Sequence, residues 1–166
     1  MRRLSLILLL ALAALPAAAL AAGSATGDGV LELRAVNAVV ILSGKGVLWG
    51  QMDRGSMRVT ALSTPDAQQP YVSGADRIWL PSDNVTAYSG TNLHFRLTGG
   101  RYKIRFKGSG LDLTAIGVGS ADMTGDPTAL TAGDYALDGG KWTIVPLSER
   151  VVDYGLQPPP TTTATP

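Results

Sequence analysis

The most chemically distinctive part of the chain is a run of basic side chains near its centre. No acidic residue occurs between Asp83 and Asp112, and most of the basic residues there stand two positions apart. Side chains two apart on a strand point to the same face. This spacing predicts a positively charged binding surface for an anionic ligand. Its members are His94, Arg96, Arg101, Lys103, Arg105 and Lys107.

The residues between these cations are apolar, which predicts a hairpin over residues 91–107. A two-residue turn at Gly99-Gly100 would place Leu97 opposite Tyr102 and leave the cations on the outer face. Like charges facing each other across a ladder are unfavourable by tenths of a kcal/mol. An anionic partner would relieve that repulsion. The alternative is a solvated face that discourages edge-to-edge aggregation.

Catalytic chemistry finds little support in the residue types. The chain has no cysteine and a single histidine, His94, so Cys-His chemistry is excluded and a Ser-His-Asp triad would depend on that one residue. A carbohydrate-active enzyme that uses two aspartates stays open as an alternative. Its candidates are Asp53, Asp112, Asp122, Asp126, Asp134 and Asp138. We expect no enzymatic activity, no cofactor and no metal site.

Three tryptophans, Trp49, Trp79 and Trp142, could stack on sugar rings. Each also fits a strand position, and large aromatic residues at such positions more often fill a core. The sequence therefore favours buried tryptophans. Trp49, beside Gly50, is the best candidate for exposure.

The elements that must position these groups are strands. Apolar runs are short and often alternate with polar residues, and the chain beyond its leader holds no apolar stripe of helical spacing. Gly, Asn, Asp and Pro separate the runs, which predicts an all-β domain of about 10–12 short strands. An antiparallel sandwich and a closed barrel need the same alternation, so both stay open.

Two further segments carry predictions of their own. Residues 38–43 are apolar on both faces, which predicts a central strand covered on both sides or, in a self-assembling structural envelope protein, a subunit interface. A Gly139-Gly140 turn would form a second hairpin, with Leu137 beside Trp142.

A weak internal echo suggests two related halves. A shift of 64 residues aligns Gly44-Lys45-Gly46 with Gly108-Ser109-Gly110 and Gly55-Ser56 with Gly119-Ser120, with eight identities over positions 33–81. Glycines at special turns are what two copies of one unit would retain. The halves would span about residues 28–88 and 90–150.

The ends of the chain predict export. Residues 1–21 read as a signal peptide with a positive start, an apolar core and an Ala-x-Ala cleavage site, although an uncleaved membrane anchor is the alternative. Cleavage leaves a single domain at 22–157 with no further membrane span, and a Pro/Thr-rich tail at 158–166 that is expected to be disordered. Loss of Arg2 and Arg3 leaves 12 basic against 13 acidic residues, which does not favour nucleic-acid binding.

An Ala- and Leu-rich leader, the lack of cysteine and the runs at 44–60 and 93–119 resemble those of small exported β-proteins of high-GC bacteria such as actinobacteria. That resemblance implies a bacterial host and a secreted or cell-envelope location, and no activity. Together these observations predict a non-enzymatic extracytoplasmic β-domain that binds an anionic cell-wall polymer or glycan.

Overall fold

A computed structural model describes residues 27–129 and 131–155. The predicted leader and Pro/Thr-rich tail lie outside these residues. All regular structure in them is β, and it forms one eight-stranded antiparallel sheet that is not closed. The predicted all-β class is confirmed, and the closed-barrel alternative does not match the open sheet. In the described part of the chain, no helix is long and apolar enough to cross a membrane.

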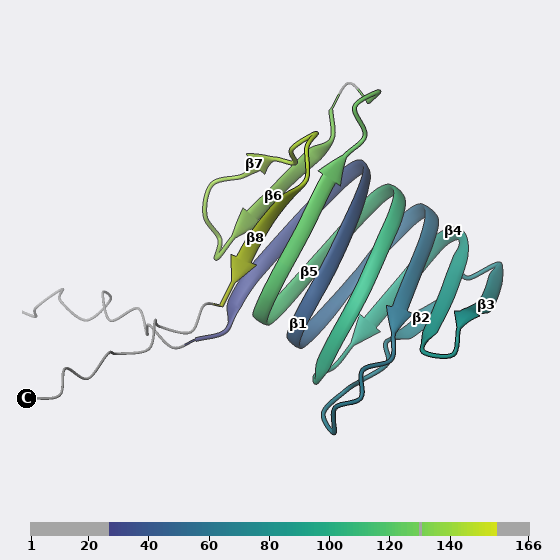
Figure 1. The fold of residues 1–166 in the computed structure, drawn as a ribbon. Helices are drawn as coiled ribbons and strands as arrows, with labels where there is room; N and C mark the ends of the chain where they lie inside the picture. The colour runs from purple at the N-terminus through teal and green to yellow at the C-terminus, as the bar shows by residue number, and fades with distance from the viewer. Residues whose placement is uncertain (1–26, 130, 156–166) are drawn as a thin grey trace, which may run out of the picture.

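Three long strands carry most of the sheet: β1 (Gly29–Thr60), β4 (Val85–Leu97) and β5 (Arg101–Gly125). Five short strands complete it: β2 (Tyr71–Ser73), β3 (Arg77–Ser82), β6 (Gly133–Leu137), β7 (Thr143–Ile144) and β8 (Arg150–Tyr154) (Figure 1). The sequence predicted more and shorter strands because it treated the glycines as strand ends.

β1 pairs with β5 in two registers at once. Ala38 lies opposite Gly108 on one side and opposite Gly125 on the other, and these two partners are 17 residues apart in β5. β1 therefore pairs with two different stretches of β5, one along each of its edges. Two strands that pair in this way must coil around a common axis. The two strands therefore form a coil with 17 residues per turn, visible in Figure 1 as successive parallel bands. β4 extends the coil by pairing with residues 48–60 of β1.

The coil is flattened, so each turn crosses two walls. The first wall comprises residues 30–36 and 47–53 of β1, 111–116 of β5 and 92–97 of β4, flanked by β6 and β2. The second wall comprises residues 38–44 and 56–60 of β1, 101–107 and 118–124 of β5 and 85–89 of β4, flanked by β8 and β3. We call the bends that join the walls corners.

Glycine makes the corners possible without ending a strand. One edge of the coil carries a register column of small residues: Gly125, Ala38, Gly108, Gly55 and Gly90. At Gly55, where φ is +154°, an added Cβ would overlap the Lys107 carbonyl oxygen. The backbones of neighbouring turns thus approach more closely at this corner than a side chain permits.

The glycines matched by the 64-residue shift lie at the corners of the coil or next to them. Gly46 and Gly55 of β1, and Gly108 and Gly110 of β5, lie where strands bend between the walls. Gly44 and Gly119 lie at the end of the second wall, next to such a bend. Shared corner geometry is therefore sufficient to explain the matched glycines, and the descent from two halves stays a prediction.

The core lies inside the coil and is lined by alternate residues of both walls. Phe95 of the first wall meets Phe106 of the second, with ring centroids 4.8 Å apart. Trp49 is 41% exposed, Trp142 is 37% exposed and Trp79 is half-buried, so the expectation of core tryptophans is wrong. Tyrosines and phenylalanines fill the interior instead.

Residues 38–43 form a central part of the sheet, with one face in the core. Val40 and Leu42 point inward and are fully buried. Val39 and Ile41 point outward and are half-buried, and Val39 lies between Lys107 and Thr124 in register. No second layer covers them in the described residues. The long side chains on the neighbouring strands cover part of Val39 and Ile41.

The second predicted turn is shifted by one residue. The N–H of Gly140 donates to the carbonyl of Leu137 across 2.8 Å, and Asp138 and Gly139 have φ of 54° and 67°. Positive φ at both central positions defines a type I′ turn, for which Asp-Gly is a preferred pair. The predicted Gly139-Gly140 centre is therefore wrong, and Tyr135 pairs with Thr143.

A buried tyrosine pair fastens β8 to the coil. Tyr102 and Tyr154 lie at the two ends of a register row whose middle positions are Gly44 and Gly119. Because these glycines lack side chains, the two rings can lean over them, and the hydroxyl oxygens are 2.6 Å apart. Burial, followed by the adjacent Tyr102 hydroxyl, raises the pKa of Tyr154. Burial also raises the pKa of Tyr102, partly offset by its bond to Tyr154.

Crowding at a corner is tested by comparing two glycines of nearly equal φ. Gly99, with φ of +156°, has no atom within 4 Å of a built Cβ, whereas Gly55 is crowded by backbone. Gly99→Ala should lower the free energy of unfolding by about 1 kcal/mol, and Gly55→Ala by about 2–4 kcal/mol. Urea denaturation measures both. Equal losses would contradict close packing of the turns.

The tyrosine pair is tested by removing its hydroxyls singly and together. Tyr154→Phe leaves the Tyr102 hydroxyl buried without its partner and should lower the free energy of unfolding by about 1–3 kcal/mol. The double variant Tyr102→Phe/Tyr154→Phe removes both polar groups and should recover part of that loss. A double variant as unstable as the sum of the singles would rule out direct coupling.

The same pair predicts loss of stability in alkali. Both pKa values are raised in the folded state, so the unfolded chain releases these protons first as pH rises through about 10. Stability should be insensitive to these groups below that pH and should fall above it. Urea denaturation between about pH 8 and about pH 11 measures the free energy of unfolding. This free energy should fall more steeply with pH for the native protein than for the double phenylalanine variant. Parallel curves would contradict the raised pKa values.

Candidate functional site

The predicted central hairpin is absent. β4 and β5 both run antiparallel to β1 and do not pair with each other, so they run in the same direction. Gly99-Gly100 is therefore a corner that carries the chain from the first wall to the second. The expected pairing of Leu97 with Tyr102 is wrong, because Leu97 pairs with Leu48 and Tyr102 with Gly44.

The alternation of charged and apolar residues is nevertheless present on each strand. Tyr102, Ile104 and Phe106 are buried. Because Phe95 and Phe106 meet inside the coil, their outward neighbours point away from each other. The predicted set is thus divided: His94 and Arg96 lie on the first wall, and Arg101, Lys103, Arg105 and Lys107 lie on the second.

Arg101 is bound within the protein. Its Nε lies 3.3 Å from Oδ2 of Asp66, and Nζ of Lys45 is at the same distance from that oxygen. Partial desolvation opposes ionisation of Asp66, but Lys45, Thr64 and Arg101 together outweigh it and lower its pKa. The Arg101 N–H also donates to the Asp66 carbonyl across 2.7 Å. Arg101 therefore fastens the loop at 61–70 to the start of β5.

Four cations remain together on the second wall, and we call them the basic strip: Arg58, Lys103, Arg105 and Lys107. Arg58 of β1 lies directly opposite Arg105 of β5. Arg105 is half-buried and the others are exposed. Both ion pairs of the described residues involve Asp66, so the strip forms none there. Sequence reasoning missed Arg58, since only the long-range register places it beside Arg105.

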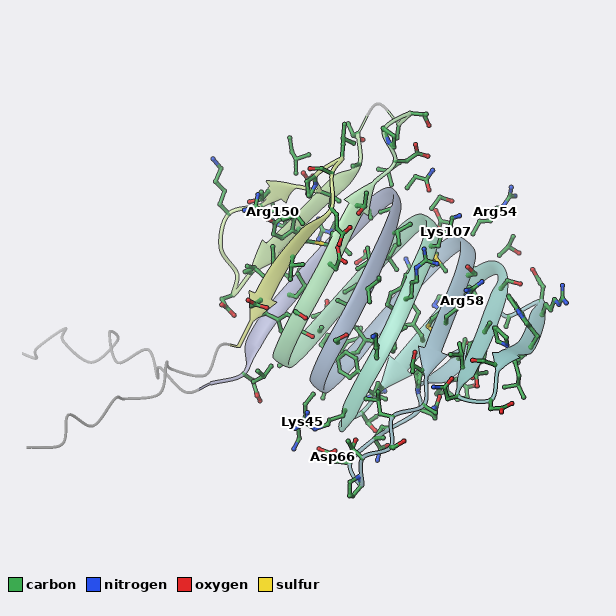
Figure 2. All side chains as sticks on the ribbon, viewed as in Figure 1. Lys45, Arg54, Arg58, Asp66, Lys107 and Arg150 are labelled. Atoms are coloured by element: carbon green, nitrogen blue, oxygen red, sulfur yellow. The ribbon has the colours of Figure 1, made fainter. Side chains whose placement is uncertain are left out.

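The basic strip leads into a hollow of about 480 Å³ at the glycine corner. Gly55 and Gly108 leave its centre open, while Arg54 and Lys107 are among the side chains that line it. Figure 2 shows Arg54, Lys107 and Arg58 in one region of the coil, with Lys45 and Asp66 at the opposite edge. Hydroxyl and amide groups complete the lining, from Ser56, Ser109 and Asn37. The Asn37 Nδ2 donates to Asp126 across 2.6 Å.

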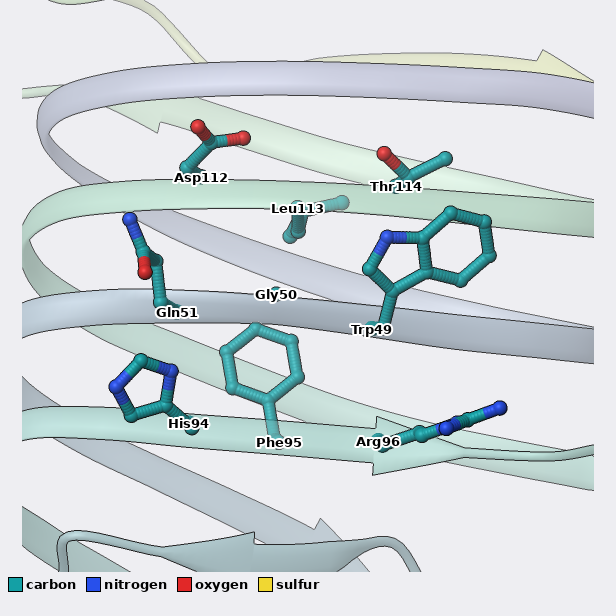
Figure 3. Close-up of a pocket in the computed structure, with 9 residues that line it drawn as sticks. All are labelled: Trp49, Gly50, Gln51, His94, Phe95, Arg96, Asp112, Leu113 and Thr114. Carbon is teal, nitrogen blue, oxygen red and sulfur yellow. The ribbon is translucent and has the colours of Figure 1, made fainter.

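A second hollow of about 410 Å³ lies on the outer surface of the first wall. Gly50, Phe95 and Leu113 form its floor (Figure 3). Six outward side chains surround it in two cross-strand rows, Thr114–Trp49–Arg96 and Asp112–Gln51–His94. His94 and Arg96, predicted as members of a basic patch, thus stand beside an exposed tryptophan and a carboxylate.

Two of the candidate catalytic aspartates have structural contacts. Asp126 accepts hydrogen bonds from the Thr128 hydroxyl and N–H, which lower its pKa. Asp138 accepts from the N–H of Val30 across 2.8 Å and so ties its turn to the start of β1. Register places Asp112 and Asp134 on either side of Arg34.

In the described ranges, no group of three or more His, Asp or Glu residues could hold a metal ion. Comparison with known proteins adds no assignment, since no family model, curated protein or solved structure matches the chain. The chemistry of the two outer walls is thus the basis for assigning a function.

Proposed function

We propose that this protein is an exported, non-enzymatic domain that binds an anionic polymer of the cell envelope through the basic strip. The observation that carries the proposal is the direct opposition of Arg58 and Arg105 across neighbouring strands. Like charges in this arrangement repel each other in the free protein. A bound phosphate or carboxylate replaces that repulsion with charge-assisted hydrogen bonds.

The strip's shape suits a polymer better than a small ion. Lys103, Arg105 and Lys107 stand two residues apart on one strand, so their Cα atoms are spaced by about 6.7 Å. At its Lys107 end the strip continues into the hollow lined by Arg54. The rigid sheet thus presents a line of positive charge that a chain of repeated anions can follow.

Charge reversal tests the proposal. Arg105→Glu should weaken binding to teichoic acid, to an acidic glycan or to anionic vesicles by about tenfold or more at low salt. The three ligands distinguish a phosphate polymer, a carboxylate polymer and a lipid surface. Binding of the native protein should also weaken steeply as salt is added, because the strip is exposed to solvent. Isothermal titration calorimetry and vesicle co-sedimentation measure these affinities.

Arg150→Glu is the matched control, because it changes the net charge equally at an exposed residue on β8, away from the strip. It should leave affinity nearly unchanged. Equal losses for the two variants would indicate an effect of net charge alone. Retained affinity in Arg105→Glu and in Lys103→Glu/Arg105→Glu would overturn the proposal.

A further inference from the structure

We infer that the first wall carries a separate saccharide site, which takes an extended polysaccharide containing uronic acid residues. The site is the cross-strand row Thr114–Trp49–Arg96–Tyr71 with the hollow beside it, and we call it the aromatic row. It lies on the wall opposite the basic strip, so the inference does not depend on the proposed function.

Exposed aromatic side chains are the first observation. Trp49 is 41% exposed and Tyr71 is 75% exposed, although the core holds Phe95, Phe106 and three tyrosines. A flat indole on an open sheet offers a large apolar face that water solvates poorly. The C–H face of a pyranose ring is the ligand surface that such a platform complements.

Spacing along the row is the second observation. Trp49 and Tyr71 both pair with Arg96, so they lie two strand spacings apart, about 9.6 Å. This is roughly twice the length of one sugar unit in an extended polysaccharide. Alternate sugar rings of one chain can therefore stack on Trp49 and Tyr71, with the intervening sugar above Arg96.

The third observation is the chemistry between and beside the rings. Arg96 belongs to neither ion pair of the described residues, and its guanidinium can bind a carboxylate through two parallel hydrogen bonds. Sugar hydroxyls need both donors and acceptors. The neighbouring side chains Gln51, His94, Asp112 and Thr114 supply both kinds. A carboxylate-bearing sugar satisfies Arg96 and these groups together.

The test uses the full chain with polygalacturonate, alginate and hyaluronate as probes, each beside its carboxyl-reduced form. Trp49→Ala and Tyr71→Ala should each weaken binding of the favoured acidic probe by about tenfold. Binding should shift the tryptophan fluorescence of the native protein and not that of Trp49→Ala. Arg96→Gln should weaken binding of the acidic probe and leave binding of its neutral form unchanged.

Trp79→Ala is the control, since Trp79 lies on β3 beside the second wall and contacts Arg77. It should bind as the native protein does. Circular dichroism establishes that each variant is folded. The inference is overturned if no probe binds in a manner that depends on Trp49. It is also overturned if light scattering gives the mass of a dimer for the native protein and of a monomer for Trp49→Ala, because a second copy would then cover this surface. Arg105→Glu should leave the Trp49-dependent fluorescence shift unchanged, even where it weakens total binding of an acidic probe through the basic strip. Failure of the saccharide site and failure of the basic strip therefore give different results.

Discussion

The fold depends on one constraint, the pairing of β1 with two different stretches of β5. Each residue in the middle of β1 has two β5 partners that are 17 positions apart, so β1 and β5 must form a coil. Winding decides which residues face the interior and which wall each outward side chain occupies. It also brings backbones of successive turns together at the corner that contains Gly55 and Gly108, where an added Cβ would overlap neighbouring backbone.

This winding also explains why one alternating sequence produces two chemically different surfaces. Outward side chains on opposite walls point away from each other, as the neighbours of Phe95 in β4 and of Phe106 in β5 do. The second wall gathers arginine and lysine side chains from β1 and β5. The first wall gathers aromatic and hydrogen-bonding side chains from β1, β2, β4 and β5.

Local pattern predicted the strands and their inward and outward faces, because alternation is a property of a few consecutive residues. It correctly oriented Tyr102, Ile104 and Phe106 toward the core. It failed at the glycines, since a turn that reverses the chain and a corner that continues a strand use the same residues. Gly99-Gly100 was misread for this reason. The opposition of Arg58 and Arg105 depends on a register between distant segments, which one sequence does not reveal.

The two-register pairing has a kinetic consequence. Thr60 pairs with Val85, whereas Gly29 pairs with Gly117, so the chain separation of partners grows from 25 to 88 residues along β1. The entropy of closing a loop makes the shorter connection easier to form first. For the partners of β1, loop-closure entropy therefore favours pairing that begins near Thr60 and proceeds backward toward Gly29. Most residue contacts in the described part of the chain are between distant segments, and nonlocal contacts of this kind are typical of slow-folding β topologies. The start of β1 has the most distant partners, although it is synthesised before them.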